Sequence, residues 1–478
     1  MSESEVIVVG AGPTGLALSL ALARHHVPSV VLDATDGEVV PRAARTCVLR
    51  PDTAACLPPV PGARWSAWRA QRRRQLVRRV ELDEETSPVH IEQHTVERSL
   101  RAALDEEKLA RVVTGSHLDI LEQDADGVTA HTRGAGGTWW RGSYLVGCDG
   151  ARSTVRKLLG VRFTGRTAVE RHAVAALRTR LPWDGEALLH RDLGGRPGEV
   201  TARPLPGGVW RLDWLLPPRG DLVTPDELLH RVHTTLAQWY GTDSADASAV
   251  GPYELLDTGV YTTHQRLARR WRVDRAFLAG DAAHLMGALG VQSVDEGLRD
   301  ATNLAWKIAH AWHHGDRPPH PQHPTGATTS GLGEATEALL DSYEAERRTA
   351  VAARLRAVDQ AMTVVRRGGG GLRALLPGGG ARSHLGLLTD GHVGSGLLGA
   401  PPAYERSPLT LPRGAVASVP VGTAPGSPVR DVPVTALNGQ QVHLRERLGG
   451  VGGELLVLLV APGTGVWDSR HWLSHTPV

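Results

Sequence analysis

The sequence has few cysteines and no long apolar run. Its 3 cysteines, among 478 residues, show no CxxC spacing, so the sequence predicts neither a disulfide framework nor a zinc site. We expect Cys47, Cys56 and Cys148 to be buried as small apolar residues. A membrane-spanning helix needs about 18 consecutive apolar residues, which the chain lacks, and its first residues lack the basic and apolar regions of a signal peptide. The sequence therefore predicts a cytoplasmic protein without a membrane partner.

A strong charge of one sign is also missing. The formal net charge is +2, and lysine occurs only at Lys108, Lys157 and Lys307, so nearly all basic residues are arginines. The arginines of 69–79 precede the acidic residues of 81–85, and this mixed, strand-like pattern favours a solvated sheet face over a nucleic-acid-binding patch. We expect no nucleic-acid partner.

Histidines gather in residues 312–335, together with prolines, glycines and threonines. Metal binding is one interpretation of His313, His314, His320 and His323. A surface insertion is the favoured interpretation, because such a composition provides no fixed framework for ligands. No metal site is predicted.

The first forty residues predict a βαβ unit around a glycine-rich turn. Its three segments are apolar: the strands 6–9 and 29–32 and the helix 16–23. In the turn, Gly10 permits the tight bend, Gly12 lets the backbone approach a pyrophosphate, and Gly15 allows close packing of the helix, which starts beyond Thr14. Asp33, at the end of the second strand, is placed to accept hydrogen bonds from ribose hydroxyls. The pattern predicts a dinucleotide-binding site.

Two later segments, 144–156 and 275–283, each run from an apolar strand into a turn that contains aspartate and glycine. With the first turn they belong to an ordered set whose remaining members are the segments 297–307 and 340–348. Over roughly residues 5 to 360, this set resembles the class A flavoprotein monooxygenases, the family of p-hydroxybenzoate, phenol and polyketide hydroxylases. The resemblance implies FAD as the cofactor.

The resemblance also assigns roles to single residues. Asp281, in the turn Gly280-Asp281, would bind the ribityl hydroxyls, and Asp149 would lie at a junction that serves FAD and, in working enzymes, NAD(P)H. Arg42 matches an arginine near the pyrophosphate, and Gln93 matches a glutamine on the flavin side. Taken individually, Arg42 and Gln93 also fit solvated helix or loop residues.

The implied fold is α/β: a Rossmann-like FAD-binding domain of the GR2 type, an inserted β-sheet substrate domain, and a short, incomplete thioredoxin-like tail. The expected domains follow the chain: FAD-binding, 1–165 and 270–365; substrate-binding sheet, 166–269, with a contribution from 58–92; linker, 366–409; tail, 410–478. The tail lacks CxxC, so we interpret it as a structural or dimer-forming appendage without redox chemistry of its own.

The middle region has strand character. Trp210, Leu212, Trp214 and Leu216 alternate so as to bury one face of a strand. These tryptophans line a ligand cavity in one interpretation and pack in the core in the favoured one. By the resemblance, this region holds an apolar, often aromatic, ligand over the flavin. Thr224 then begins a helix, with proline in its first turn and glutamate three residues after the cap.

One loop departs from the family pattern. After Gly-Asp-Ala-Ala-His, the hydroxylases usually carry a Pro-Pro pair, Gly-Gln-Gly and an asparagine, and backbone amides there face the flavin. The replacements in this chain are Gly287 and Ala288 for the prolines, Val291-Gln292-Ser293 for Gly-Gln-Gly, and Asp295 for the asparagine. Gln292 and Asp295 are therefore the candidate residues for influence on the chemistry, and the sequence identifies no catalytic acid or base.

The charge of Asp295 has two interpretations. A carboxylate about 5 Å from a reduced flavin anion, at an effective dielectric of about 20, would oppose reduction by roughly 3 kcal/mol. Alternatively, Asp295 is a helix N-cap that Arg299, one turn later, partly neutralises. Both interpretations are compatible with each other.

Two functions follow from the resemblance. The first is an NAD(P)H-dependent hydroxylase of an aromatic or polyketide-type intermediate of secondary metabolism, such as antibiotic biosynthesis, in which hydride reduces FAD and a C4a-hydroperoxide transfers the hydroxyl group. The second is a redox-neutral [4+2] cyclase of a polyene polyketide, in which FAD shapes the pocket and NAD(P)H has no role. A flavin-binding pseudoenzyme is a third, non-catalytic interpretation. The sequence favours the hydroxylase slightly.

Overall fold

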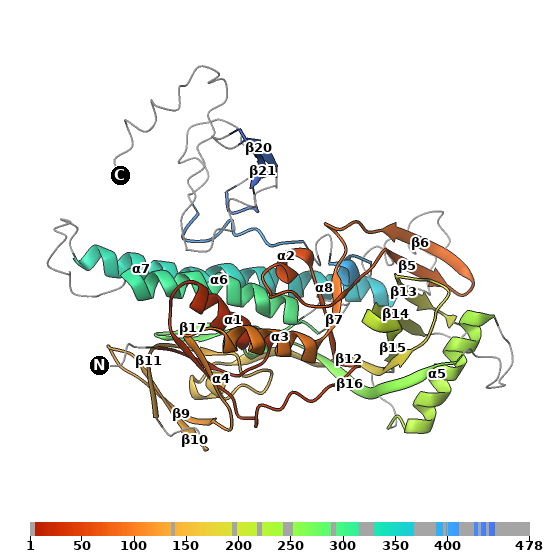
Figure 1. Ribbon diagram of the computed structural model, residues 1–478, viewed down its shortest axis with the longest axis horizontal. Coiled ribbons are helices and arrows are strands. Elements are labelled where there is room, and N and C mark those ends of the chain that lie inside the picture. Colours follow the sequence, from red (N-terminus) through yellow and green to blue (C-terminus); the bar gives the residue numbers. More distant parts are fainter. Residues whose placement is uncertain are drawn as a thin grey trace. The chain divides into compact units, whose positions relative to one another are not determined.

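The computed structural model describes residues 5–134, 139–193, 198–217, 222–241, 252–287, 293–314, 329–367, 389–394, 398, 400–410, 425–428, 432–435 and 439–444. Contacts divide the chain into two units, Met1–Val429 and Arg430–Val478. Figure 1 shows two large sheets in the first unit, with long helices running beside them. Most of the histidine-rich segment, of the expected linker 366–409 and of the expected tail 410–478 lies outside the described residues, so the predictions for those parts stay predictions.

The first large sheet, sheet A, has a parallel centre. Its strands, in spatial order, are β17 (Arg272–Val273), β18 (Ala276–Leu278), β11 (Trp139–Gly147), β1 (Glu5–Val9), β2 (Ser29–Leu32) and β8 (Ala110–Val113), with β10 (Val128–Arg133) and β9 (His117–Gln123) extending from β11. Helix α1 (Pro13–Arg24) connects β1 to β2, which pair in parallel. The predicted βαβ unit is confirmed.

Helices and one small sheet surround sheet A. The small sheet orders β3 (Thr46–Leu49), β7 (Val89–Glu92) and β4 (Ala63–Arg64). The helical segments of this part are α2 (Pro51–Ala54), α3 (Gln93–Asp105), α4 (Thr154–Leu158), η4 (Gly280–Ala282), α6 (Ser293–His314), α7 (Thr329–Tyr343), the π-helical turn η5 (Glu344–Arg348) and α8 (Thr349–Arg367). Apolar side chains of β1, β2, β11, α1 and α6 form one large core.

The second large sheet, sheet C, lies toward the right of Figure 1. Its strands, in spatial order, are β19 (His284–Leu285), β16 (Glu254–Ala268), β12 (Phe163–Arg178), β15 (Val209–Leu216), β14 (Glu199–Leu205), β13 (Glu186–Arg191), β5 (Ala67–Arg72) and β6 (Gln75–Glu81). The short 3-10 turn η2 (Pro206–Gly208) joins β14 to β15. Strands β5 and β6 thus join a sheet whose other strands come much later in the chain.

One face of sheet C packs against helix α5 (Pro225–Tyr240) and is apolar. Trp210, Leu212, Trp214 and Leu216 are all buried there, as their alternation predicts. The indole of Trp214 donates to Thr235 of α5 at 3.0 Å. These tryptophans therefore pack in the core, which was the favoured interpretation. The predicted cap of α5 is also confirmed, because the Thr224 side chain accepts from the backbone of the third helical residue.

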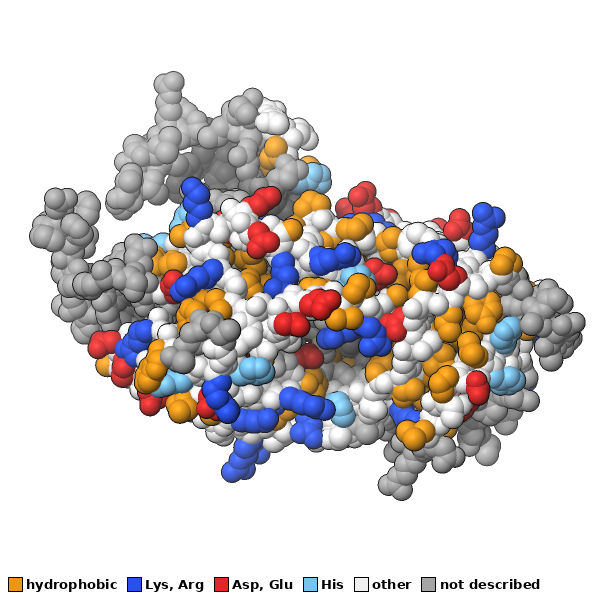
Figure 2. All heavy atoms as spheres, turned by 60° about the horizontal axis from the view of Figure 1, so that its bottom comes forward, with side chains coloured by type: hydrophobic (Ala, Val, Ile, Leu, Met, Phe, Trp, Pro, Cys, Tyr) orange, Lys and Arg blue, Asp and Glu red, His pale blue; other side chains and the backbone are white. Residues whose placement is uncertain are grey.

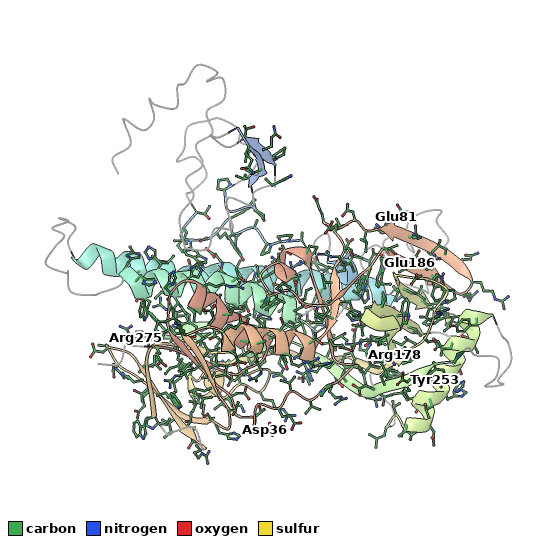
Figure 3. All side chains as sticks on the ribbon, viewed as in Figure 1. Asp36, Glu81, Arg178, Glu186, Tyr253 and Arg275 are labelled. Atoms are coloured by element: carbon green, nitrogen blue, oxygen red, sulfur yellow. The ribbon has the colours of Figure 1, made fainter. Side chains whose placement is uncertain are left out.

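The opposite face of sheet C, which we call the inner face, carries polar side chains on β12, β14, β15 and β16. Where the inner face reaches β13 and β5 it becomes apolar and packs against α8, Val393 and Leu398. Toward this end of the sheet, Glu186 of β13 lies near Glu81 of the edge strand β6 (Figure 3), and it pairs with Arg69 at 2.9 Å and with Arg79 at 3.0 Å. Figure 2 shows basic and acidic side chains interspersed over the face that it presents.

In the second unit, β20 (Pro433–Thr435) and β21 (Gln441–His443) form an antiparallel pair. The thioredoxin-like tail stays a prediction. Two cysteines, Cys47 and Cys148, are buried as expected, but the prediction for Cys56 is wrong, since it lies exposed just after α2. Among the described helices, none combines the length and the apolar character that a membrane crossing requires.

Candidate functional site

Two glycine motifs, far apart in the sequence, meet in space. A Cβ atom at Gly280 would lie 2.7 Å from Oγ1 of Thr14, and one at Gly297 would lie 2.3 Å from the same atom. Three segments therefore approach one another closely: the first turn, the turn after β18 and the start of α6. A side chain at Gly280 or Gly297 would collide with Thr14. The first turn also touches the end of β11, because a Cβ atom at Gly10 would lie 2.5 Å from the carbonyl oxygen of Cys148.

Gly12 differs from its neighbours in the first turn. A Cβ atom at Gly15 would lie 2.0 Å from the carbonyl oxygen of Gly10, whereas one at Gly12 would meet nothing within 4 Å. Gly12 is also the N-cap of α1, and no side chain caps the helix there. The open space therefore faces backbone N–H groups at the positive end of a helix, which suits a phosphate.

Three carboxylates surround this turn. Asp33 ends β2 and accepts from the backbone N–H of Ala11 at 2.6 Å, so it braces the turn. Asp149 follows β11, and its Oδ2 accepts from the backbone of Thr154 at 2.6 Å, while its buried Oδ1 has no partner among the described residues. Asp281 lies in η4, where burial raises the pKa of its carboxyl, an effect that His284 and Ser293 only partly offset. The unpaired oxygen of Asp149 suits a hydroxyl group of a sugar or a ribityl chain.

Gln93 and Arg42, the two remaining predicted residues, lie in different surroundings. Gln93 begins α3, is buried, and accepts from Nε of Arg45 at 3.1 Å. Arg42 is 54% exposed, and it pairs instead with Asp257 of β16 at 3.0 Å. Arg45 was not among the residues predicted from the sequence, although its charge acts on Asp281. Arg45 lies three residues after Arg42 and directly before β3, and this position could have marked it as a candidate cofactor-site residue.

The loop after β19 begins with an unusual backbone conformation. Gly287 has φ +74°, and a Cβ atom there would lie 2.5 Å from the carbonyl oxygen of His264. A proline ring fixes φ near about −65°, so the family's proline is incompatible with this conformation. Gln292 lies outside the described residues, and its role stays a prediction.

Asp295 is buried in the first turn of α6, as its third residue. Its carboxylate accepts from the backbone N–H of Arg50 at 2.9 Å and from the hydroxyl of Thr53. The N-cap interpretation is therefore wrong, because these bonds tie α6 to the start of α2 rather than close the end of α6. The expected contact with Arg299 is present at 3.7 Å, but the Arg50 guanidinium is closer, at 2.7 Å.

Two cations therefore neutralise the Asp295 charge. Burial by itself raises the pKa of Asp295, but the charges of Arg50 and Arg299 outweigh burial and hold the pKa below its usual value. The carboxylate stays ionised and paired at neutral pH. An isolated charge facing a bound flavin, as in the first interpretation, is not what the structure contains.

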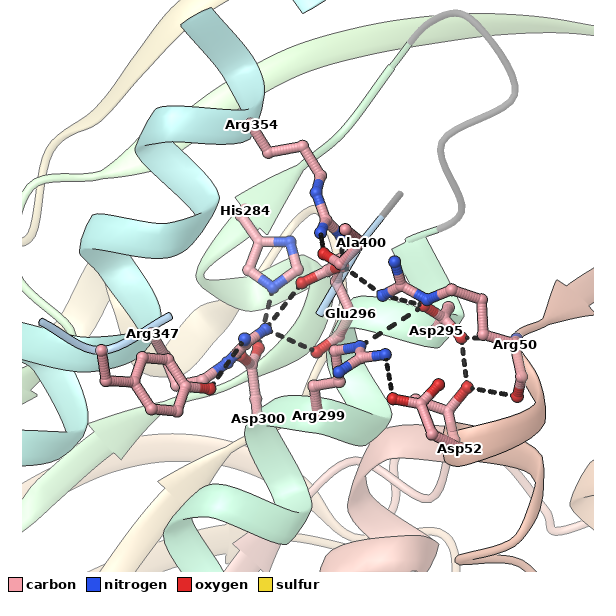
Figure 4. Close-up of polar contacts among 12 residues, drawn as sticks. Arg50, Asp52, His284, Asp295, Glu296, Arg299, Asp300, Arg347, Arg354 and Ala400 are labelled. Carbon is pink, nitrogen blue, oxygen red and sulfur yellow. Dashed lines mark hydrogen bonds and ion pairs between the residues drawn. The ribbon is translucent and has the colours of Figure 1, made fainter. Parts of the chain in front are cut away.

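The Asp295 pairs belong to a larger buried network, drawn in Figure 4. Glu296 contacts Arg50 at 3.2 Å and Arg347 at 2.7 Å, and it also pairs with Arg354 of α8. Arg347 reaches Asp300 at 2.8 Å, and Asp300 in turn holds His284 at 2.8 Å. Sequence reasoning missed this network, although adjacent acids at the start of α6 opposite an arginine-rich α8 were a signal for it.

The segment 400–410 closes the network from one side. The Arg354 guanidinium donates to the carbonyl of Ala400 at 2.7 Å, and Arg347 donates to the hydroxyl of Tyr404 at 3.3 Å. Ser407 donates to Glu346 at 2.6 Å. This part of the expected linker is therefore anchored on η5 and α8.

The chain is similar in sequence to FAD-binding proteins. Residues 3–319 match the family model described as an FAD binding domain. A 3-(3-hydroxy-phenyl)propionate/3-hydroxycinnamic acid hydroxylase from Comamonas testosteroni is 36% identical over 241 residues, which are 50% of this chain and 36% of that protein. The chain thus matches only about a third of the length of this curated relative.

Two solved structures show the extent of the shared fold. The anhydrotetracycline hydroxylase from Streptomyces rimosus superposes with a TM-score of 0.58 and 27% identity, over 92% of this chain and 82% of that one. A Diels-Alderase of the pyrroindomycin biosynthetic pathway superposes with a TM-score of 0.57 and 24% identity, over 92% of this chain and 85% of that one. The second likeness concerns the fold alone.

Proposed function

Because the chain belongs to the FAD-binding-domain family, we propose that it is an FAD-dependent monooxygenase that hydroxylates an aromatic or polyketide-type substrate with NAD(P)H as co-substrate. FAD, when bound, would supply the redox chemistry that couples oxidation of NAD(P)H to use of oxygen. The protein's part is to bind the cofactor, to hold the substrate and to control charge and water around both.

The residues present fit FAD. The open space beside Gly12 at the start of α1 suits the pyrophosphate, and the unpaired oxygen of Asp149 and the carboxyl of Asp281 suit hydroxyl groups. We assign Gly10, Gly12, Thr14, Gly15 and Gly280 to the turns that admit the cofactor. Asp33, Arg42 and Gln93 complete the proposed set, with Arg45 added beside Gln93.

The neutralisation of Asp295 is the observation that makes a redox reaction compatible with the changed loop. An unpaired carboxylate near the flavin would oppose its reduction by roughly 3 kcal/mol. The carboxylate of Asp295 instead lies 2.7 Å from the guanidinium of Arg50 and 3.7 Å from that of Arg299. The replacement of asparagine by aspartate therefore does not by itself argue against turnover. The relatives named as hydroxylases support the same choice.

The experiment is anaerobic reduction. Purified protein with bound FAD is mixed with NADH or NADPH, with and without a phenolic ligand such as 3-hydroxycinnamate, and the visible flavin band is followed. We expect the band to bleach, and to bleach faster with a ligand. Flavin that stays oxidised with both nucleotides and every ligand would overturn the hydroxylase proposal.

A second candidate, the redox-neutral cyclase, draws support from Gly287. Its left-handed backbone is closed to proline, so the chain leaves β19 along a path that the usual Pro-Pro loop does not follow. A loop with a changed path alters the flavin surroundings without disturbing the Gly10–Gly15 turn. Conversion of a linear polyene in the absence of nicotinamide, by protein whose flavin stays oxidised, would favour this candidate.

A further inference from the structure

The last two turns of α6 carry three histidines. His310 and His314 stand one helical turn apart, at positions i and i+4, so their side chains lie on the same face of the helix. Both residues are exposed to solvent, and their ring centroids are 4.8 Å apart. His313 instead donates from Nε2 to the carbonyl oxygen of His25 at 2.9 Å. The pair of His310 and His314 is therefore accessible, whereas His313 holds the end of α6 against the chain that leaves α1.

This histidine pair has no polar partner of its own. Within the part of the chain that the structure describes, neither His310 nor His314 makes a hydrogen bond or an ion pair. The ring of His284, by contrast, is held by the carboxylate of Asp300 at 2.8 Å. The side chains that act electrostatically on His310 are the imidazoles of His314 and His313. The ring nitrogens of the pair are thus left to solvent or to a ligand.

The spacing of the two rings fits one shared metal ion. A zinc ion lies about 2.0–2.1 Å from an imidazole nitrogen, and hence about 3 Å from the centre of that ring. Two ring centroids 4.8 Å apart then subtend an angle of about 100° at the ion, which falls between the ligand angles of octahedral and tetrahedral coordination. Because both rings are exposed, rotation of the side chains can turn one nitrogen of each toward the ion.

Two imidazoles select the class of ion. Imidazole nitrogen suits Zn²⁺, Cu²⁺ and Ni²⁺, whereas Mg²⁺ and Ca²⁺ prefer oxygen ligands. Two rings on one helical turn bind an ion more tightly than either ring alone, because the second ligand is already in place when the first binds. The C-terminal end of a helix carries a partial negative charge that favours a cation, and His314 is the last residue of α6. The end of α6 therefore combines ligands and charge that favour a divalent transition metal.

We propose that His310 and His314 chelate a divalent transition-metal ion at the C-terminal end of α6, with water completing its coordination. The described residues contain no group of three or more His, Cys, Asp or Glu side chains arranged to hold a metal. The site therefore supplies two protein ligands and stays open to solvent. Because the two ligands lie one turn apart, the bound ion holds the last turn of α6 in its helical conformation.

The metal site is remote from the proposed cofactor site. At a rise of about 1.5 Å per residue, His310 lies about 22 Å along α6 from Asp295. The inference therefore goes beyond the proposed function and does not depend on it. Zn²⁺ has no redox chemistry of its own, so adding or removing it should leave the FAD content and the reduction of FAD by NAD(P)H unchanged.

The test is a calorimetric titration of metal-free holoprotein, purified without a histidine tag, with Zn²⁺. We expect the tightest class of sites in the wild type to hold one ion per chain. His310→Gln and His314→Gln should each weaken this binding by at least about tenfold, because each leaves a single imidazole. Saturating Zn²⁺ should raise the thermal unfolding midpoint of the wild type, since an ion that binds the folded state stabilises it. The midpoints of the two variants should barely move.

A second measurement identifies the ligands directly. Cu²⁺ binds nitrogen ligands more tightly than Zn²⁺ does, and the electron paramagnetic resonance spectrum of bound Cu²⁺ shows coupling to its nitrogen ligands. With one equivalent of Cu²⁺, we expect the pattern of two imidazoles in the wild type and its loss in both variants. This readout does not depend on stability, so it distinguishes a lost ligand from a frayed helix. Unchanged flavin absorbance shows that each variant is folded.

Two controls test the assignment to this pair. His230→Gln removes an exposed histidine of α5 whose neighbour one turn later is Thr234, and it should leave Zn²⁺ binding unchanged. Replacement of His320 and His323 by glutamine should leave most of the affinity in place. A loss as large as that of His314→Gln would move the site to those two residues and overturn the inference. Equal Zn²⁺ affinity of the wild type and either single variant would overturn it as well.

Discussion

The Oδ2 atom of Asp295 lies 2.7 Å from Nη2 of Arg50, and the two side chains are only 7% and 9% exposed. The pair joins the first turn of α6 to the chain entering α2. The Arg50 backbone N–H adds a second bond to the same carboxylate, at 2.9 Å. The aspartate that replaces the family's asparagine is therefore half of a buried ion pair and not an isolated charge.

Loss of Arg50 should destabilise the protein. Arg50→Met leaves the Asp295 carboxylate buried, with Arg299 at 3.7 Å as its remaining cation, and breaking a buried pair costs about 3–5 kcal/mol. Urea unfolding measures the change. The control is Arg133→Ala, whose pair with Asp119 is 77% and 42% exposed and is expected to contribute less than about 1 kcal/mol. Equal effects of the two variants would contradict the role of burial.

Gly12 and Gly15 should separate cofactor binding from folding. A methyl group at Gly12 meets nothing within 4 Å, so Gly12→Ala should change the unfolding free energy of the apoprotein by less than about 0.5 kcal/mol. It should lower the FAD content, because the methyl group occupies the space proposed for the pyrophosphate. Gly15→Ala should instead destabilise the fold, since the methyl group would lie 2.0 Å from a backbone oxygen. Normal FAD affinity of folded Gly12→Ala protein would refute the pyrophosphate assignment.

Gly287 should tolerate no side chain. Its φ of +74° costs an alanine roughly 1 kcal/mol, and the contact with the His264 carbonyl at 2.5 Å adds a clash with backbone. Gly207 is the matched control, with φ +72° and nothing within 4 Å of a Cβ atom. Thermal unfolding should show a clearly larger loss for Gly287→Ala than for Gly207→Ala, and Gly287→Pro should be worse still. A similar loss for both alanine variants would show that the clash relaxes.

Acid should destabilise the protein partly through His392. Burial lowers its pKa to about 3 in the folded protein, against about 6.5 in an unfolded chain. The unfolded state therefore binds the proton first, and stability falls as pH drops below about 6.5, by at most about 1.4 kcal/mol per pH unit. His392→Phe keeps an aromatic ring next to Trp68, whose ring centroid lies 4.7 Å from that of His392. This variant should lose less stability than the wild type between about pH 6.5 and 5. Replacement of the exposed His117 by glutamine should not. An unchanged slope in His392→Phe would contradict the assignment.

The sequence predicted the glycine turn of the βαβ unit well because the information for it is local. Gly10, Gly12 and Gly15 report backbone conformation and close approach, which depend on a few neighbouring residues. The alternation from Trp210 to Leu216 likewise reports one buried face of a strand. The outcomes at Cys56 and Asp295 differed from expectation because burial and charge pairing depend on what packs against a residue from elsewhere in the chain.

By itself, the sequence determined the βαβ unit, the glycine turns and the FAD-binding family, since these follow from residue types at fixed spacings. Only the tertiary structure decided that Arg50 neutralises Asp295, a partner 245 positions away, and that His172 shares a face with Tyr261 and Leu215. Ion pairing depends on distance and enclosure between segments far apart in the sequence, and the register of β12 with β15 and β16 brings the other three residues onto one face.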